Sequence, residues 1–199
     1  MVSYTSDNVL LVLALEAEAQ DCFKDFSTCF CGVGKVNASV NLSVALAGWK
    51  ERRGSFPDLV LNVGSAGSTH FPQGETVNCI QFMQRDMDAT ALGTPLYTTP
   101  FDDTPALFSY GVRCEAFPMG ICGSGDNFSV EGTKNEWSVT DMEAYALAKF
   151  CAAHEIPFCC FKYITDGADD CAVRSWEDTL PLAARALRQA VDALIKRGA

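Results

Sequence analysis

Carboxylates that follow short apolar segments are the residues of this chain best suited to chemistry. Such groups occur at Glu16 and Glu18, at Asp141 and Glu143, and at Asp166. Hydrolysis of a glycosidic bond uses groups of this kind, because a carboxylate activates the attacking water and a carboxylic acid protonates the leaving group. Nearby oxygens then stabilise a sugar with oxocarbenium-ion character. The acidic residues therefore indicate cleavage of a glycosidic bond as a candidate reaction.

Each polar group also has a structural explanation. The acids at 16 and 18 can be solvated residues in the first turn of a helix, where the helix dipole favours negative charge. Asp141 can cap the helix that follows it, with Glu143 as a first-turn acid. Asp166 precedes a glycine and suits a turn, as does Ser65 in the run Gly64-Ser65-Ala66-Gly67. Taken singly, none of these residues distinguishes a catalytic site from ordinary local structure.

Several other kinds of site find no support in the sequence. The glycines at 32 and 34 complete neither a phosphate-binding P-loop nor a G-x-G-x-x-G fingerprint. No serine lies in a G-x-S-x-G elbow. The ten cysteines contain no C-x-x-C pair, and only His70 and His154 offer imidazole. We therefore expect neither a metal nor an organic cofactor.

The elements that must position these residues alternate between strand and helix patterns. Short apolar segments predict strands at 9–15, 29–31, 58–64, 76–82, 119–122 and 158–164. Helical patterns cover 35–50, 142–154 and roughly 178–197. The first of these has an apolar stripe formed by Val36, Val40, Val44 and Ala47. Residues 91–109 are rich in Pro, Thr and Asp and are predicted to form a loop.

This alternation predicts an α/β fold, with residues 1–199 forming a single three-layer α/β/α domain around a central mixed sheet. Several of the strands end in a polar or glycine-rich turn. Ligands of such sheets bind at the ends of strands. The acidic groups and Ser65 are therefore expected to meet at one edge of the sheet.

Composition restricts the partners. The formal net charge of −10 argues against sequence-independent binding to nucleic acid. The N-terminus lacks the basic start of a secretory signal, and the apolar run from Val9 to Leu15 is too short to cross a membrane. Reduced cysteines suit the cytoplasm. We expect a cytoplasmic protein that binds a small molecule.

The polar clusters, in their order along the chain, resemble one family. Four segments are similar to motifs of the methylthioadenosine/S-adenosylhomocysteine nucleosidases. They are Ala14-Leu15-Glu16-Ala17-Glu18, Gly32-Val33-Gly34-Lys35-Val36, Asn62-Val63-Gly64-Ser65-Ala66-Gly67 and Ser124-Gly125-Asp126-Asn127-Phe128. Three further segments resemble blocks of that family. The family's M-E-A block matches Met142-Glu143-Ala144, its V-P-F block matches Ile156-Pro157-Phe158, and its S-D-x-A-D block matches Thr165-Asp166-Gly167-Ala168-Asp169. The resemblance spans residues 14–169 and implies the nucleoside phosphorylase-like fold.

The resemblance also implies a role for each site residue. Glu18 would activate water, and Asp166 would protonate N7 of a purine, which makes the base a better leaving group. Glu143 would accept hydrogen bonds from the ribose hydroxyls, and Phe128 would stack on the base. The implied substrate-binding positions are Ser65, Phe128, Ser129, Asp141, Met142, Glu143 and Trp176. The family commonly has a glutamate at position 141, and its members are homodimers.

Three functions remain open at this point. The first is hydrolysis of a purine nucleoside, and the second is phosphorolysis on the same fold. Phosphorylase relatives hold phosphate with arginines, whereas this chain has acids in the first loop and Asn62 before the Gly64-Ser65 turn, so water is the favoured nucleophile. Arg85 and Arg174 are the arginines that the fold could bring to the site. The third function is nucleoside binding without catalysis.

Overall fold

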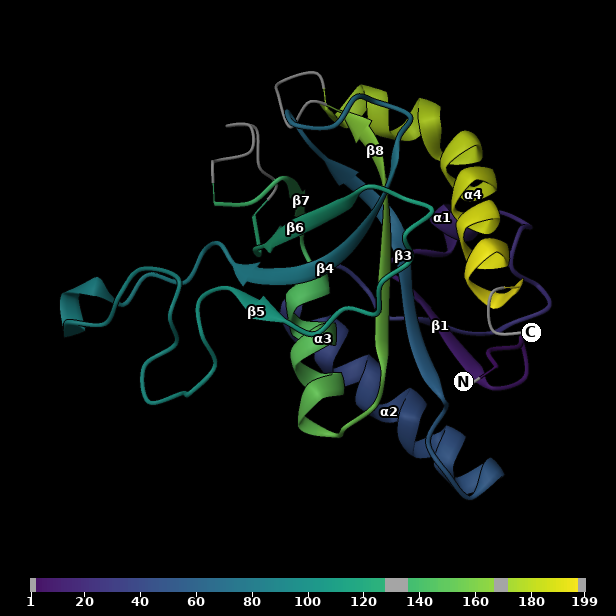
Figure 1. The fold of residues 1–199 in the computed structure, drawn as a ribbon, viewed down its shortest axis with the longest axis horizontal. Coiled ribbons are helices and arrows are strands. Elements are labelled where there is room, and N and C mark those ends of the chain that lie inside the picture. Colours follow the sequence, from purple (N-terminus) through teal and green to yellow (C-terminus); the bar gives the residue numbers. More distant parts are fainter. Residues whose placement is uncertain (1–2, 128–135, 167–171, 197–199) are drawn as a thin grey trace.

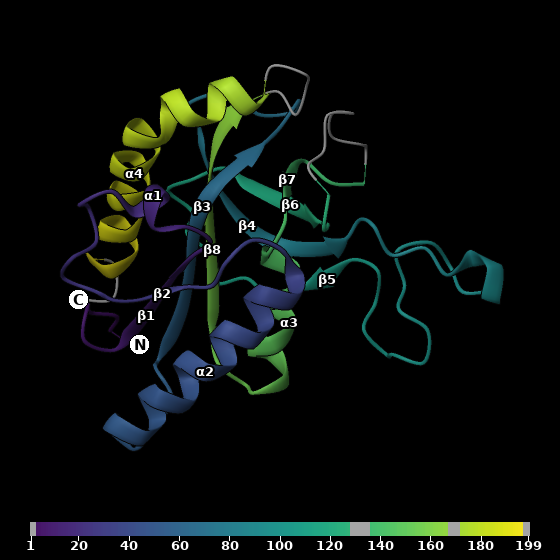
Figure 2. The ribbon, with the colours of Figure 1, turned by 180° about the vertical axis from the view of Figure 1, so that it is seen from behind.

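The computed structural model describes residues 3–127, 136–166 and 172–196, and the side chains of 172–178 are not described. A mixed sheet forms its centre, with helices on both faces (Figures 1 and 2). The elements in chain order are β1 (Val9–Leu13), α1 (Glu16–Ala19), β2 (Ser27–Phe30), α2 (Lys35–Arg53), β3 (Leu59–Gly67), β4 (Thr76–Gln84), η1 (Thr90–Leu92), β5 (Phe108–Ser109), β6 (Met119–Ser124), β7 (Val139–Asp141), α3 (Ala144–Ala153), β8 (Phe158–Asp166) and α4 (Ala172–Lys196).

The sheet is open at one end and closed at the other. Strands β2, β1 and β3 are parallel neighbours at the open end, and β8 continues the parallel run beside β3. Beyond them, β8 pairs antiparallel with β4, β4 is parallel to β6, β6 is parallel to β7, and β7 returns to β3. These last pairings close a ring through β3, β8, β4, β6 and β7. The ring brings the ends of β3, β7 and β8 close together.

Alternating side chains of the central strands pack into two separate hydrophobic cores, one on each face of the sheet. On one face Leu10, Val12 and Val60 pack with the helices α2 and α3. On the other face Leu11, Leu61 and residues of α4 pack with the segment around α1. Because successive side chains of a strand point to opposite faces, a strand covered on both sides is apolar throughout. The three-layer arrangement predicted from the sequence is confirmed.

The structure corrects one prediction for α2. The predicted apolar stripe is not the face that packs on the sheet, because Val36, Val40 and Val44 are 72%, 55% and 66% exposed. The buried face consists of Ala38, Leu42, Leu46 and Trp49. Helix α2 carries two apolar stripes, and the one with the larger side chains removes more apolar surface from water when it is buried. The valine stripe is left on the outer surface.

Residues 88–107 form an arm that projects from the body of the molecule (Figure 1, left). The segment was predicted to be a loop, and it contains the short helix η1 and leads into β5, a two-residue strand that pairs with β4. Leu92 and Phe101 on the arm are fully or largely exposed. Within the part of the chain described, no helix is long and apolar enough to span a membrane.

Candidate active site

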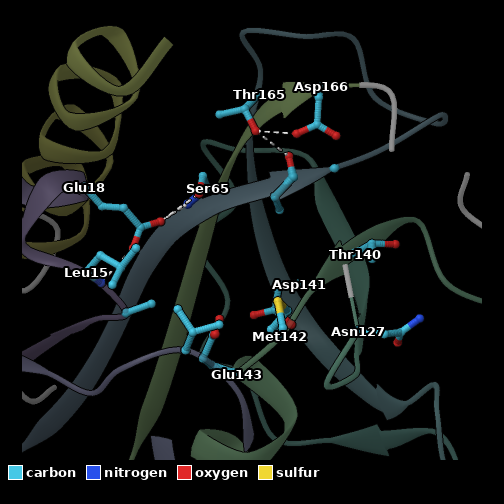
Figure 3. A pocket seen from close by; sticks show the side chains of 14 residues that line it. Leu15, Glu18, Ser65, Asn127, Thr140, Asp141, Met142, Glu143, Thr165 and Asp166 are labelled. Atoms are coloured by element: carbon cyan, nitrogen blue, oxygen red, sulfur yellow. Dashed lines mark hydrogen bonds between the residues drawn. The ribbon is translucent and has the colours of Figure 1, made fainter. Parts of the chain in front are cut away.

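A cavity of ≈ 250 Å³ lies where the carboxyl ends of several strands meet. Its walls come from the segments that follow β1, β2 and β6 and from the ends of β3, β7 and β8 (Figure 3). The lining residues are Ala14, Leu15, Glu18, Val33, Ser65, Ala66, Gly67, Asn127, Thr140, Asp141, Met142, Glu143, Thr165 and Asp166. Six of the residues predicted from the sequence are in this set: Glu18, Ser65, Asp141, Met142, Glu143 and Asp166. The acids that are far apart in sequence therefore share one cavity.

Glu18 is buried and firmly oriented. Its Oε1 accepts hydrogen bonds from the backbone N–H of Ser65 at 2.9 Å and from the Ser65 hydroxyl at 2.7 Å, and its Oε2 accepts from the backbone N–H of Leu15 at 3.2 Å (Figure 3). Three donors therefore hold this carboxyl group in one orientation. Ser65, at the end of β3, supplies two of them to Glu18 in α1.

Gly64 separates Glu18 from a buried cation. A Cβ atom at Gly64 would lie 3.3 Å from Glu18 Oε1 and 3.5 Å from Nζ of Lys162. Lys162 belongs to β8, and its side chain is only 2% exposed. The absence of a side chain at Gly64 therefore leaves room for both the carboxylate and the ammonium group at this point.

Asp141 is the ion-pair partner of Lys162. Asp141 Oδ2 lies 2.8 Å from Lys162 Nζ, and its side chain is 1% exposed. The carboxylate also accepts hydrogen bonds from the hydroxyl of Ser124 at 2.5 Å and from the backbone N–H of Ala144 at 2.9 Å. Burial alone would raise the pKa of Asp141, but the charge of Lys162 and these hydrogen bonds outweigh it and lower the pKa. Asp141 thus caps α3, while a contact with substrate stays a prediction.

Glu143 has a different environment, although it is two residues away. Its Oε1 accepts one hydrogen bond, 2.9 Å long, from the backbone N–H of Gly34. Burial, and then the negative charge of Asp141, raise the pKa of Glu143 to about 7. Gly34 has φ +90°, and a Cβ there would lie 3.0 Å from Asp126 Oδ1. A glycine is therefore needed to present this N–H to Glu143.

Asp166 ends β8 on the far side of the cavity. Its Oδ2 lies 2.7 Å from the hydroxyl of Thr165 (Figure 3). The backbone carbonyl of Asp166 accepts from the N–H of Ser68 at 3.0 Å. Asp166 is buried and lines the cavity opposite Glu18 and Glu143. This places an acid on each side of a space that can hold a small ligand.

Some predicted residues are outside the described part of the chain. Phe128 and Ser129 belong to residues 128–135, and the side chain of Trp176 lies in the undescribed part of α4. Met142 is half-buried at the cavity wall. The sequence analysis missed Lys162 and Thr165. A single charged residue within the apolar strand 158–164 was the available signal for Lys162.

Arg85 does not face the cavity. Its guanidinium Nη atoms donate to the side-chain oxygen of Asn127 at 2.7 Å and to the carbonyls of Asn127 and Gly125. Lys35 is paired with Asp86 and Asp126. Of the described lining residues, four are acids and none is Lys or Arg. The cavity therefore offers negative charge and hydrogen-bond acceptors.

Comparison with known proteins shows the family to which this chain belongs. The family model of the phosphorylase superfamily matches residues 24–196. The 5'-methylthioadenosine/S-adenosylhomocysteine nucleosidase of Haemophilus ducreyi is 31% identical over 190 residues, covering 82% of this chain and 77% of that protein. This chain belongs to the nucleosidase family of the phosphorylase superfamily.

Solved structures of nucleosidases have the same fold. Futalosine hydrolase of Helicobacter pylori has a TM-score of 0.82 at 18% identity and covers 95% of this chain and 97% of its own. The 5'-methylthioadenosine/S-adenosylhomocysteine nucleosidase of Neisseria meningitidis, solved with methylthio-immucillin-A, has a TM-score of 0.75 at 24% identity and covers 95% and 98%. At these identities the likeness shows the fold, and the sequence similarity shows the family.

Proposed function

We propose that this protein hydrolyses the N-glycosidic bond of a purine nucleoside of the 5'-methylthioadenosine or S-adenosylhomocysteine type, releasing free purine and the ribose moiety. Glu18 activates water, and Asp166 protonates N7 of the purine. The observation that carries the proposal is the charge of the cavity, whose described lining has four acids and no basic residue. A phosphate dianion would be repelled there, whereas water is not.

The arrangement of the acids supports these roles. Glu18 is held by the donors on Ser65 and Leu15, so its carboxyl group has a fixed position at the cavity from which to act as a base. Asp166 lies across the cavity from it, beside a hydroxyl. Glu143, which also lines the cavity opposite Asp166, accepts hydrogen bonds from ribose hydroxyls. Met142 packs on the sugar. The contacts with the base that the resemblance implies for Phe128, Ser129 and Trp176 remain predictions, because the side chains of these residues lie outside the described part of the chain.

The arginines considered for phosphate give no support to phosphorolysis. Arg85 donates to Asn127 and Gly125 and contributes no atom to the cavity wall. The side chain of Arg174 lies outside the described part of the chain. Lys162 is paired with Asp141 behind the lining. Hydrolysis is therefore favoured over phosphorolysis.

The deciding experiment is a product assay with and without phosphate. The substrates are 5'-methylthioadenosine, S-adenosylhomocysteine, adenosine, inosine and futalosine. Free purine and free pentose formed without phosphate are expected, with a methylthio- or homocysteinyl-substituted nucleoside as the fastest substrate. Pentose 1-phosphate formed only with phosphate would show a phosphorylase. Absence of turnover in a folded protein that binds purine would show a nucleoside-binding protein.

Two variants test the assigned roles. Asp166→Asn is expected to lower kcat by at least ~100-fold without changing the fold, as for a general acid. Glu18→Gln is expected to abolish hydrolysis while purine binding persists. Normal turnover in Asp166→Asn contradicts the role of Asp166 as the acid. Loss of purine binding in Glu18→Gln, with a normal rate of hydrolysis remaining, contradicts the role of Glu18 as the base.

We also propose that the protein is a homodimer, in agreement with its family. The exposed valine stripe of α2 and the exposed apolar side chains of the projecting arm are the surfaces that suit a second copy. Sedimentation of the wild-type chain as a dimer, and of Val40→Lys as a monomer, is the expected result. A wild-type monomer refutes the proposal.

A further inference from the structure

The end of β8 is irregular at the point where Asp166 enters the cavity. In the parallel pairing of β3 with β8, Ala66 faces Ile164 and Gly67 faces Asp166, so Thr165 is an extra residue in the ladder. Neighbouring residues of a regular strand point to opposite faces, whereas here Thr165 and Asp166 both line the cavity. A bulge redirects side chains in this way, and bulges are common beside active sites.

The hydroxyl of Thr165 lies between two acceptors. Its Oγ1 is 2.7 Å from Asp166 Oδ2 and 3.3 Å from the backbone carbonyl oxygen of Ala66, and the residue is completely buried (Figure 3). A hydroxyl has one hydrogen and can donate to only one of them at a time. The contact with Asp166 is the shorter of the two, so the hydroxyl donates to Oδ2. Oδ2 can accept this hydrogen both when the proton of the acid is on Oδ1 and after it has left.

The backbone around the bulge is held in place by the turn between β3 and β4. The carbonyl of Ile164 accepts a hydrogen bond from the N–H of Gly74 at 2.8 Å. The carbonyl of Thr165 accepts one from the side-chain amide of Gln73 at 2.7 Å. The carbonyl of Asp166 accepts one from the N–H of Ser68 at 3.0 Å. Three successive carbonyls are thus bound by one turn. Because the backbone is held in this way, the hydroxyl of Thr165 has a defined position beside Oδ2 of Asp166.

We propose that Thr165 is a positioning residue whose hydroxyl donates to Oδ2 of Asp166, while the other carboxyl oxygen, Oδ1, gives its proton to the purine. This inference rests on the proposed function. Before the reaction, Oδ1 of Asp166 carries the proton and donates to N7, and Oδ2 accepts from Thr165. As the bond between C1' and N9 breaks, its electron pair passes to the purine and N7 takes the proton of Oδ1. The hydrogen bond from Thr165 then stabilises the new carboxylate, while the water that adds to C1' gives its proton to Glu18.

The consequence is an effect that depends on the leaving group. A hydrogen bond to an ionised group is stronger than one to a neutral group, so Thr165 stabilises Asp166 most after the proton has left. A substrate whose leaving group departs without a proton gains nothing from this. A 4-nitrophenyl riboside, which leaves as nitrophenolate, is such a substrate.

The experiment compares Thr165→Val and Thr165→Ser on two substrates. These are the fastest nucleoside of the panel and the 4-nitrophenyl riboside with the same 5' group. Thr165→Val is expected to lower kcat for the nucleoside by about 10- to 100-fold, with KM nearly unchanged, because a hydrogen bond to a charged group is lost. For the nitrophenyl riboside its kcat should stay within about threefold of wild type, because no proton transfer to the leaving group is needed. Thr165→Ser, which keeps a hydroxyl, should retain nucleoside hydrolysis.

Controls separate a positioning role from a structural one. Thr28→Val, on the edge strand β2 and far from the cavity, removes a comparable hydroxyl and should leave both reactions unchanged. Thr165→Ala provides a second hydroxyl-free variant if valine does not fit. Normal nucleoside turnover in the hydroxyl-free variants overturns the proposal, as does an equal loss with both substrates.

The result with Asp166→Asn distinguishes the two proposals. If that variant loses nucleoside hydrolysis but Thr165→Val does not, Asp166 is the acid and only the role of Thr165 is wrong. If Asp166→Asn turns over the nucleoside normally, the proposed function of Asp166 fails, and the proposal for Thr165 fails with it.

Discussion

Asp141 and Glu143 lie two residues apart at the same cavity and are almost equally buried, yet their electrostatic environments differ. Asp141 has the ammonium group of Lys162 at 2.8 Å and hydrogen bonds from Ser124 and Ala144. Glu143 has one backbone N–H, from Gly34, and faces the charge of Asp141. The pKa of Asp141 is lowered, whereas that of Glu143 is raised to about 7.

Because the pKa values of these two buried acids shift in opposite directions, burial does not by itself decide the charge of an acid in this cavity. The position of the Lys162 ammonium group decides it, because a cation at hydrogen-bond distance outweighs the cost of removing a carboxylate from water. The charged form of Asp141 is therefore favoured, and it pairs with Lys162. Glu143 can take up a proton near neutral pH and is available to a ligand.

The largest expected effect follows removal of the cation. Lys162→Met leaves Asp141 buried without its partner, and we expect the free energy of unfolding to fall by about 3–5 kcal/mol. Urea denaturation at pH 7 measures this. Asp141→Asn added to Lys162→Met should recover part of the loss, because the unpaired charge is then removed.

An exposed ion pair gives the matched control. Lys24 and Asp21 form an ion pair at 2.8 Å with side chains 76% and 88% exposed. Lys24→Met should change the free energy of unfolding by less than about 1 kcal/mol, because solvent screens exposed pairs. Equal changes in the free energy of unfolding for Lys24→Met and Lys162→Met would show that the buried pair contributes no more to stability than the exposed one.

The next effect is on activity. Glu143→Gln keeps the shape of the side chain but weakens its acceptance of ribose hydroxyls, and kcat/KM should fall by about 100-fold, as expected for lost hydrogen bonds to a charged group. Its stability at pH 7 should not fall. Asp141→Asn should instead lower the free energy of unfolding. Steady-state kinetics and urea denaturation of both variants test this, and a loss of stability in Glu143→Gln larger than that in Asp141→Asn would reverse the assignment.

The smallest effect is on the pH dependence of stability. The pKa of Glu143 rises from 4.5 to about 7 on folding, so the folded protein binds this proton more tightly than the unfolded chain. The stability that the proton contributes is present below pH 4.5 and is lost as the pH rises through 7. Between pH 5 and 8, the wild type should lose about 1–3 kcal/mol relative to Glu143→Gln. Denaturation curves at four pH values measure this, and parallel profiles for the two proteins would refute it.

Much of the fold was predictable because it depends on local pattern. The largely apolar segments 9–15, 58–64 and 158–164 correspond to β1, β3 and β8, which are covered on both faces. Element ends were less accurate, since α4 begins at Ala172, earlier than predicted, and α3 begins at Ala144, after the acids that precede it. The buried face of α2 could not be chosen from sequence, because two apolar stripes compete for the same sheet.

The sequence predicted which residues to consider for a site, but not how they pair with one another. Glu18, Ser65, Glu143 and Asp166, chosen from the order of the motifs, line one cavity, and their roles remain predictions. That Ser65 donates to Glu18, and that Asp141 pairs with Lys162, depends on strands far apart in sequence. Phe128, Ser129 and Trp176 remain predictions.

The sequence by itself determined the kinds of element, their order and the acidic residues at strand ends, because hydrophobic periodicity and turn chemistry are properties of neighbouring residues. Only the tertiary structure decided which acid has a cation. The parallel register of β3 with β8 places Lys162 opposite Gly64, and the ring of strands brings Asp141 to the same point. Charge interactions depend on distances through space, and those distances exist only after the sheet has closed.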